Sequence, residues 1–209
     1  MVRQRVRIRF SKQGDLRWIS HRDLMRTWER AFRRAEVPLS MSEGFHPKPR
    51  MMFPSALAVG IAGLDEVMDV DLARTDNAQQ LGTDLIPRLP PGLAIHSIEV
   101  LPDESKKAQA AGVAFAVTVP TEQHEQVQQK IENLLGQTSF PIQRPGRSQS
   151  LDLRPLVNAL NLDGDTLRMS LRVDGDGSAR PREVLAAIGL VDVESEGLII
   201  TRTRVELHA

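Results

Sequence analysis

The sequence predicts an α+β fold of two tandem ferredoxin-like units, each built on an antiparallel sheet. Strand-like and helix-like periodicities follow one another in the order β-α-β-β-α-β over the first half of the chain, which is the order of the split βαβ motif. A polar, alanine-rich stretch at residues 103–111 is typical of a linker, and the pattern of the second half predicts a repeat of the order of the first. We therefore expect two domains, residues 1–103 and residues 112–209.

The first unit opens with its clearest elements. Residues 5–10 alternate arginine with apolar side chains, a period of two that is typical of a strand with one buried face. Ser20 stands three positions before an acidic residue, the pattern of a helix N-cap, so we expect a helix from there to about Glu36. The other elements expected in this unit are strands at residues 51–59, 66–72 and 94–101 and a helix at residues 77–89.

The second unit has a weaker but similar pattern. Its expected elements are strands at residues 113–119, 140–144, 166–173 and 199–207 and helices at residues 122–135 and 181–188. Residues 151–156 form an additional segment, either a strand edge or a turn. The alternative architecture is a single α+β domain with one continuous sheet.

Charge is distributed unevenly along the chain. The first 50 residues hold 13 Lys and Arg against 5 Asp and Glu, a net charge of +8, and the other 159 residues hold 14 against 22, a net of −8. A basic region of this kind favours phosphates as ligands. The absence of cysteine excludes disulfides, thiolate zinc sites, cysteine nucleophiles and Cys-ligated iron–sulfur clusters. No signal-peptide pattern and no bilayer-spanning apolar run is present, so we expect a cytoplasmic protein with no membrane partner.

The first helix carries arginines on the side opposite its apolar stripe. At about 100° per residue, Leu24, Trp28 and Phe32 fall on one side of the helix and the arginines on the other. Only Glu29 lies close to these arginines as a counter-charge, whereas a surface that merely stabilises a helix intersperses both signs. We expect a phosphate-binding surface, extended by the first strand's Arg5, Arg7 and Arg9, with an ordinary solvated helix face as the alternative. The candidate RNA- or phosphate-binding residues are Lys12, Arg17, Arg22, Arg26, Arg30, Arg33, Arg34, Lys48 and Arg50.

Two histidines lie within the same basic region. His21 falls in the first helical turn and His46 in the proline-rich loop that follows the helix. Either could act as a general acid or base on RNA, with Lys12 stabilising charge on the phosphate, or both could simply be structural surface residues. A metal site from His21, Asp23 and His46 matches no strong ligand spacing, so we expect no metal and no cofactor. The strand at residues 66–72 has no aromatic residue for base stacking, so we expect contacts to phosphates and to RNA shape.

Three segments resemble a known bacterial family. They are Phe10–Lys12 (FSK), Leu16–Leu24 (LRWISHRDL) and Ser42–Pro49 (SEGFHPKP), and Asp152–Leu156 (DLRPL) resembles a further family segment. The family consists of uncharacterised radical-SAM-linked proteins, in which this module is fused C-terminal to a radical SAM protein or encoded on its own. The resemblance implies a bacterial cytosolic protein that works with a radical SAM partner on tRNA or rRNA. Because this chain has no cysteine, it would be the accessory form without the cluster.

Three functions remain open from the sequence. The first is a non-catalytic RNA-binding accessory protein that presents tRNA or rRNA to a radical SAM modification enzyme or an RNA-processing enzyme, with no preference for DNA. The second is a metal-independent endoribonuclease using His21 or His46 with Lys12. It is suggested by a looser, fold-level resemblance to CRISPR RNA-processing enzymes, although their glycine-rich C-terminal loop is not evident here. The third is a protein–protein adaptor whose basic helix docks on an acidic partner.

Overall fold

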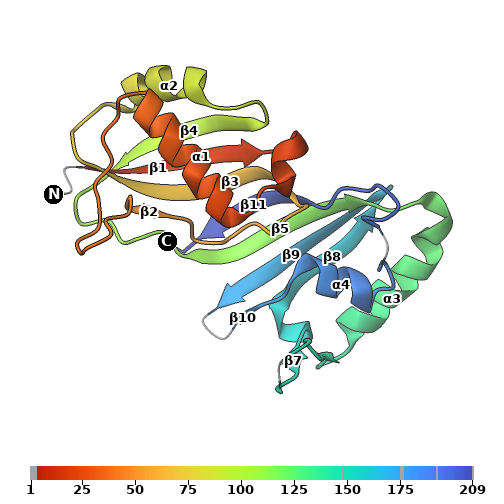
Figure 1. Ribbon diagram of the computed structural model, residues 1–209. Helices are drawn as coiled ribbons and strands as arrows, with labels where there is room; N and C mark the ends of the chain where they lie inside the picture. The colour runs from red at the N-terminus through yellow and green to blue at the C-terminus, as the bar shows by residue number, and fades with distance from the viewer. Residues whose placement is uncertain (1–3, 147, 175–176, 192, 209) are drawn as a thin grey trace. The chain divides into compact units, whose positions relative to one another are not determined.

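The computed structural model describes residues 4–146, 148–174, 177–191 and 193–208, and these form an α+β fold of mostly antiparallel strands with four α-helices (Figure 1). The chain divides into two compact units. The first runs to Gln109 and takes in the end of the chain from Leu207, and the second is Ala110–Glu206. Of the helices in the described part of the chain, none has the length and apolar character needed to cross a lipid bilayer.

The first unit follows the order β-α-β-β-α-β, as the sequence predicts. Its elements are β1 (Gln4–Lys12), α1 (His21–Arg34), β2 (Met51–Met52), β3 (Ala62–Leu72), α2 (Ala78–Leu85) and β4 (Leu93–Leu101), with short 3₁₀ helices η1 (Gly14–Trp18) and η2 (Ile86–Arg88). The strands lie in the order β2-β3-β1-β4, and each neighbouring pair is antiparallel. The strand predicted at residues 51–59 is only two residues long, because Pro54 has no amide hydrogen to continue the ladder.

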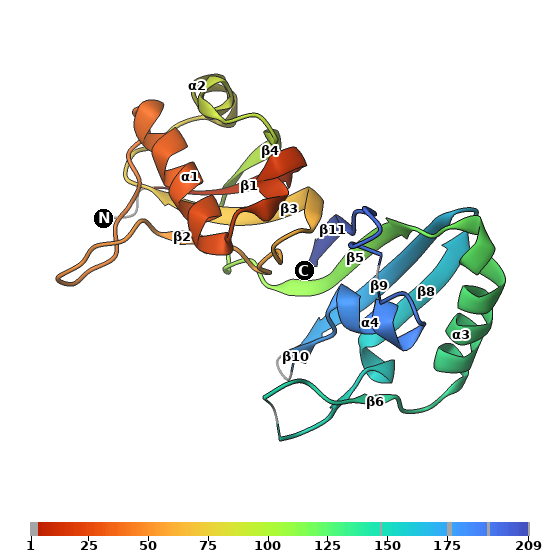
Figure 2. The ribbon, with the colours of Figure 1, turned by 45° about the vertical axis from the view of Figure 1, so that its right-hand side comes forward.

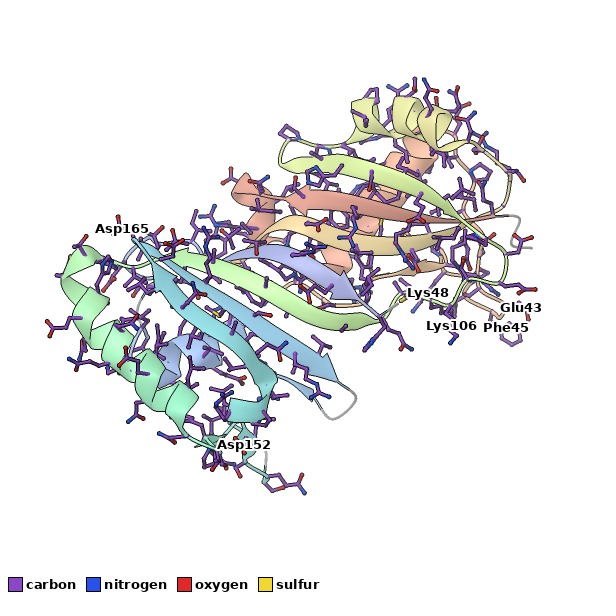
Figure 3. The ribbon with its side chains drawn as sticks, turned by 180° about the vertical axis from the view of Figure 1, so that it is seen from behind. Glu43, Phe45, Lys48, Lys106, Asp152 and Asp165 are labelled. Atoms are coloured by element: carbon purple, nitrogen blue, oxygen red, sulfur yellow. The ribbon has the colours of Figure 1, made fainter. Side chains whose placement is uncertain are left out.

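One face of this sheet is covered by α1 and α2, as Figure 1 shows, and the apolar residues of β1 explain why. Val6, Ile8 and Phe10 are fully buried and share one core with residues of both helices. The ring of Phe10 meets that of Trp28 edge to face, with 5.2 Å between centroids. Because successive side chains of a strand point to opposite faces, the arginines of β1 lie on the face without helices. Figure 3 looks onto this face.

The start of α1 confirms the predicted N-cap. The Ser20 hydroxyl accepts a hydrogen bond from the Asp23 amide at 3.2 Å and donates one to the Asp23 carboxylate at 2.7 Å. This satisfies one of the free amides that open a helix. The helix ends at Arg34, and the chain turns at Glu36, which has a positive φ of 55°.

The second unit also contains both strands and helices. Its elements are β5 (Ala110–Thr118), α3 (His124–Gly136), β6 (Pro141–Ile142), β7 (Leu151–Asp152), β8 (Val157–Asp163), β9 (Thr166–Asp174), β10 (Gly177–Ser178), α4 (Pro181–Ala187) and β11 (Thr201–Leu207), with 3₁₀ helices η3 (Thr121–Gln123) and η4 (Arg154–Leu156). The main strands lie in the order β8-β9-β5-β11, and β10 also pairs with β9. Both α3 and α4 lie against this unit's strands (Figure 2).

The strand predicted at residues 140–144 does not join the main strands of the second unit. That segment contributes only β6, which pairs with β7 in a separate two-stranded sheet, and β8 instead pairs with β9. The sequence pattern did not predict β8. The register of β8 against β9 shifts between Val157 and Ala159, and this irregularity interrupts the alternation of apolar residues that would have indicated a strand.

Candidate nucleic-acid interface

The exposed side of α1 carries its arginines. Leu24, Trp28 and Phe32 turn the opposite side of the helix into the core, so the arginines face solvent. The exposed arginines are Arg22, Arg26, Arg30, Arg33 and Arg34, and we call them the α1 arginine face. At a rise of about 1.5 Å per residue, the twelve steps from the first to the last cover about 18 Å of helix.

The α1 arginine face is only partly neutralised. Arg26 lies 3.4 Å from the Asp23 carboxylate, so this residue of the cap is also a counter-charge to the face. Arg30 donates to the Thr27 hydroxyl at 3.1 Å. Within the described residues, the other three arginines make neither a hydrogen bond nor an ion pair. The hydrogen bond from Ser20, followed by the attraction of Arg26 and Arg22, lowers the pKa of Asp23, which therefore stays ionised.

The arginines of β1 do not extend this face. Each meets an aspartate of β3: Arg5 reaches Asp71 at 2.7 Å, Arg7 reaches Asp69 at 2.8 Å and Arg9 reaches Asp65 at 2.7 Å. These hydrogen bonds raise the pKa of the Arg5 and Arg7 guanidinium groups. The expectation that the three arginines present free positive charge beside α1 is therefore wrong, because they form a cross-strand ladder of ion pairs on the opposite face of the sheet.

Lys12 is also placed differently from the expectation. Its side chain is fully buried, and Nζ donates to the Ile19 carbonyl at 3.0 Å and more weakly to the Arg17 carbonyl at 3.5 Å. The ammonium group thus ties β1 to the segment that leads into α1, and it lies away from solvent, where a phosphate would bind. Arg17 itself is half-buried, and its guanidinium lies 4.8 Å from the centre of the Trp18 ring.

Residues 40–50 form a hairpin-like loop, which we call the 40–50 hairpin. Its ends are joined by backbone hydrogen bonds from Ser42 to Lys48 at 2.8 Å and from Arg50 to Ser40 at 2.9 Å. The Lys48 amide also donates to the Ser42 hydroxyl at 3.0 Å. The hairpin projects from the edge of the sheet ahead of β2, as Figure 2 shows. The two proline-bounded arms are therefore held together before any ligand binds.

The tip of this hairpin presents an aromatic ring to solvent. Phe45 is 101% exposed and follows Gly44, whose φ of 116° favours glycine. Figure 3 shows Phe45 and Glu43 at the outer end of the hairpin and Lys48 nearer to the sheet. The strand at residues 66–72, which has no aromatic residue, gave no indication of this ring. An aromatic residue between glycine and proline in a basic loop was the signal that could have identified Phe45.

A cleft of about 450 Å³ lies between the 40–50 hairpin and the helix-free face of the sheet. Its walls are formed by Arg5, Ser42, Lys48, Pro49, Arg50, Met51, Met52, Asp69, Asp71 and Lys107. Arg5, Asp69 and Asp71 lie on the face of the sheet opposite α1. Lys48 and Arg50 line the same cleft, so they lie on that side of the sheet too. The structure thus separates the predicted cations into the α1 arginine face and a basic cleft. Sequence analysis did not identify Lys107 as a site residue.

The two candidate histidines have different surroundings. His21 is half-buried, and its ring meets the Phe53 ring edge to face at 5.0 Å between centroids. His46 is exposed near the tip of the 40–50 hairpin. The burial of Lys12 removes the exposed lysine that the endoribonuclease hypothesis pairs with these histidines. In the described part of the chain, no three His, Asp or Glu side chains are grouped as metal ligands would be.

Comparison with known proteins identifies a family. A family model described as an uncharacterized protein conserved in bacteria, DUF2344, matches residues 5–181. No curated protein matches the chain. Among solved structures, the chain is similar to an unknown protein from Galdieria sulphuraria, with 13% sequence identity, 99% of each chain covered and a TM-score of 0.32. Because the family model spans most of the sequence, the chain belongs to DUF2344, the family of uncharacterized proteins conserved in bacteria.

Proposed function

We propose that this protein is an RNA-binding accessory protein that binds the phosphates of a structured RNA, such as tRNA or rRNA, through the α1 arginine face. The observation that carries the proposal is the set of five exposed arginines on one side of one helix, three of them with neither a hydrogen bond nor an ion pair among the described residues. Guanidinium groups match phosphate oxygens in geometry and remain charged at every physiological pH.

The balance of charge on α1 favours a ligand over a solvated surface. A helix that uses charge only for stability pairs arginine with acidic residues three or four positions away. Asp23 supplies one such pair, and its carboxylate already accepts the Ser20 hydroxyl as part of the cap. Five like charges on one helix repel one another, so a polyanion that neutralises them would be bound favourably.

The choice of RNA and the identity of the partner rest on the sequence resemblance. Radical-SAM-linked proteins of this kind suggest that the bound RNA is presented to a radical SAM modification enzyme or to an RNA-processing enzyme in the cytoplasm. This chain has no cysteine, so the cluster ligands of such an enzyme would come from the partner. A protein adaptor whose basic helix docks on an acidic partner is the competing outcome of the test below.

We also propose that the two units are tandem ferredoxin-like folds. The strand orders β2-β3-β1-β4 and β8-β9-β5-β11 support this assignment, since each follows the same sequence of elements when β6, β7 and β10 are set aside. Sheets of this type leave one face free for a ligand, which fits a binding protein whose site lies outside the core.

Charge reversal on α1 tests the proposed function. Arg22→Glu combined with Arg33→Glu should lower the affinity for tRNA at least tenfold in fluorescence anisotropy at about 50 mM salt, because both side chains lie outside the core. Arg88→Glu is the control for a charge reversal elsewhere, and Arg33→Glu alone carries the same change of charge on α1; Arg88 is an exposed arginine of η2 that lies in the same unit but off α1. Equal tRNA affinity for the wild-type protein and all of these variants would refute the proposal. Salt-sensitive binding of an acidic protein, with no RNA binding at low salt, would favour the adaptor.

A further inference from the structure

We propose that the basic cleft beside the 40–50 hairpin binds a phosphorylated nucleoside. Its volume of about 450 Å³ falls in the range of small-molecule sites, about 300–1,000 Å³. The ligand is either a free nucleotide or an unpaired nucleotide of a bound RNA. Only the second source rests on the proposed function, since a free nucleotide could occupy the cleft whether or not α1 binds RNA.

The wall of the cleft is preorganised by the sheet. Met51 and Met52 of β2 pair with Val70 and Asp69 of β3. Backbone hydrogen bonds join the Asp71 amide to the Arg50 carbonyl at 3.0 Å and the Ser40 amide to the Asp71 carbonyl at 2.8 Å. Both arms of the hairpin are therefore anchored to β3, and little ordering of the backbone is needed when a ligand enters.

One part of the lining is apolar and suits a flat ring. Met51, Met52 and Pro49 are half-buried, so each still presents surface to the cleft. Methionine side chains are flexible and polarizable, and their sulfur atoms make favourable contacts with aromatic rings. These three residues could therefore cover one side of a nucleobase.

Most of the remaining lining is charged, and three of its cations have no ion pair in the part of the chain that the structure describes. The cleft is lined by four basic side chains and two carboxylates, which leaves a formal charge of +2. Both carboxylates are already engaged: Asp69 accepts two hydrogen bonds from Arg7 and one from the Ala108 amide, and Asp71 accepts one from Arg5. Lys48, Arg50 and Lys107 are exposed and have no carboxylate partner within the described residues, so their charge is directed to an anion such as a phosphate.

Asp71 adds an acceptor for the base. Its Oδ1 accepts from Arg5 at 2.7 Å, and no hydrogen bond to Oδ2 occurs in the described part of the protein. A carboxylate oxygen can accept a hydrogen bond from the exocyclic amino group of a base. An apolar wall, a cationic rim and this acceptor together suit a nucleoside phosphate better than inorganic phosphate, which would use the rim alone.

The test is a titration of the full chain, labelled with ¹³C at its methionine methyl groups, followed by NMR. Adenosine monophosphate should shift the Met51 and Met52 methyl signals to saturation and bind at least tenfold more tightly than adenosine or inorganic phosphate. The absence of such shifts would refute the site. Equal affinity for inorganic phosphate would also overturn the proposal, because it would reduce the cleft to an unspecific anion site.

Substitutions separate this proposal from the function of α1. Lys48→Glu combined with Lys107→Glu should weaken binding of adenosine monophosphate at least tenfold, whereas Lys106→Glu should not, since this neighbouring exposed lysine does not line the cleft. Arg22→Glu combined with Arg33→Glu should leave nucleotide binding unchanged while RNA binding falls. If nucleotide binding persists when RNA binding is absent from the wild-type protein, only the proposed function fails.

Competition then distinguishes the two sources. A single-stranded oligonucleotide that displaces adenosine monophosphate, and that binds less well to the Lys48→Glu protein, would identify the ligand as an unpaired nucleotide of RNA. Binding of RNA without any displacement would identify a free nucleotide. Both results require a nucleotide in the cleft and support the proposal.

Discussion

The salt dependence of RNA binding gives the most direct count of the phosphate contacts made by α1. Four of its five arginines, Arg22, Arg30, Arg33 and Arg34, form no ion pair with a carboxylate in the described part of the chain. If each contacts one phosphate and releases about 0.7–0.9 counterions, log K should fall with log salt at a slope of about −2.8 to −3.6. Between 50 and 200 mM salt, the affinity should then fall by about 50- to 150-fold.

Removing three of these arginines should make log K much less dependent on log salt. In the protein with Arg22, Arg33 and Arg34 changed to Ala, one unpartnered arginine remains on α1, and the slope should fall to about −1. Alanine retains the helix, since it has the highest helix propensity. The assay is anisotropy of labelled tRNA over a series of salt concentrations, with circular dichroism to verify folding. A slope that stays near −3 in the folded triple variant would show that the phosphates are bound elsewhere, and the reasoning from α1 would be refuted.

Three further predictions concern single residues. Lys12→Met should lower the free energy of unfolding, measured with urea, by about 2 kcal/mol, because it removes the hydrogen bond of the buried Lys12 side chain to the carbonyl of the half-buried Ile19; no change would contradict this role. Phe45→Ala should weaken binding of single-stranded RNA by about 1–3 kcal/mol and leave folding intact, because a stacked base loses its ring, whereas Phe45→Trp should retain the affinity. Hydrogen bonds from the Phe140 amide, Ser139 and the Arg154 amide lower the pKa of Asp152. The ionised carboxylate should therefore contribute fully to folding stability above the ordinary pKa of 3.8, and this contribution should be lost as pH falls through the lowered pKa. Hydrogen exchange of the Phe140 amide checks this last prediction, and protection that persists below the lowered pKa would count against it.

The order of elements in the first unit could be predicted because it depends on local patterns. Alternating side chains at residues 5–10 identify β1, and the Ser20 cap marks the start of α1 at the correct residue. The second unit was harder, since β8 carries a register shift that interrupts its alternation and β6 looks like a strand of the main sheet. Local periodicity cannot show which strands pair, because pairing depends on residues far apart in the chain.

The candidate site divides in the same way. The exposure of the α1 arginines follows from the angle of each residue around one helix, so the sequence was sufficient for it. The ion pairs of Arg5, Arg7 and Arg9, in contrast, require the register of β1 against β3. The sequence could show that these arginines share a face, but it could not show that aspartates from residues 65–71 neutralise them.

The sequence by itself determined the concentration of positive charge in the first 50 residues, the amphipathic α1 and the lack of any cysteine chemistry. Only the tertiary structure decided which cations are available to a ligand. It buried Lys12 beneath the start of α1, and it brought Lys107 beside the 40–50 hairpin to form the basic cleft. The physical reason is that helix amphipathicity is set by neighbours within a few residues, whereas neutralisation and burial of a charge are set by side chains that become neighbours only when the sheet assembles.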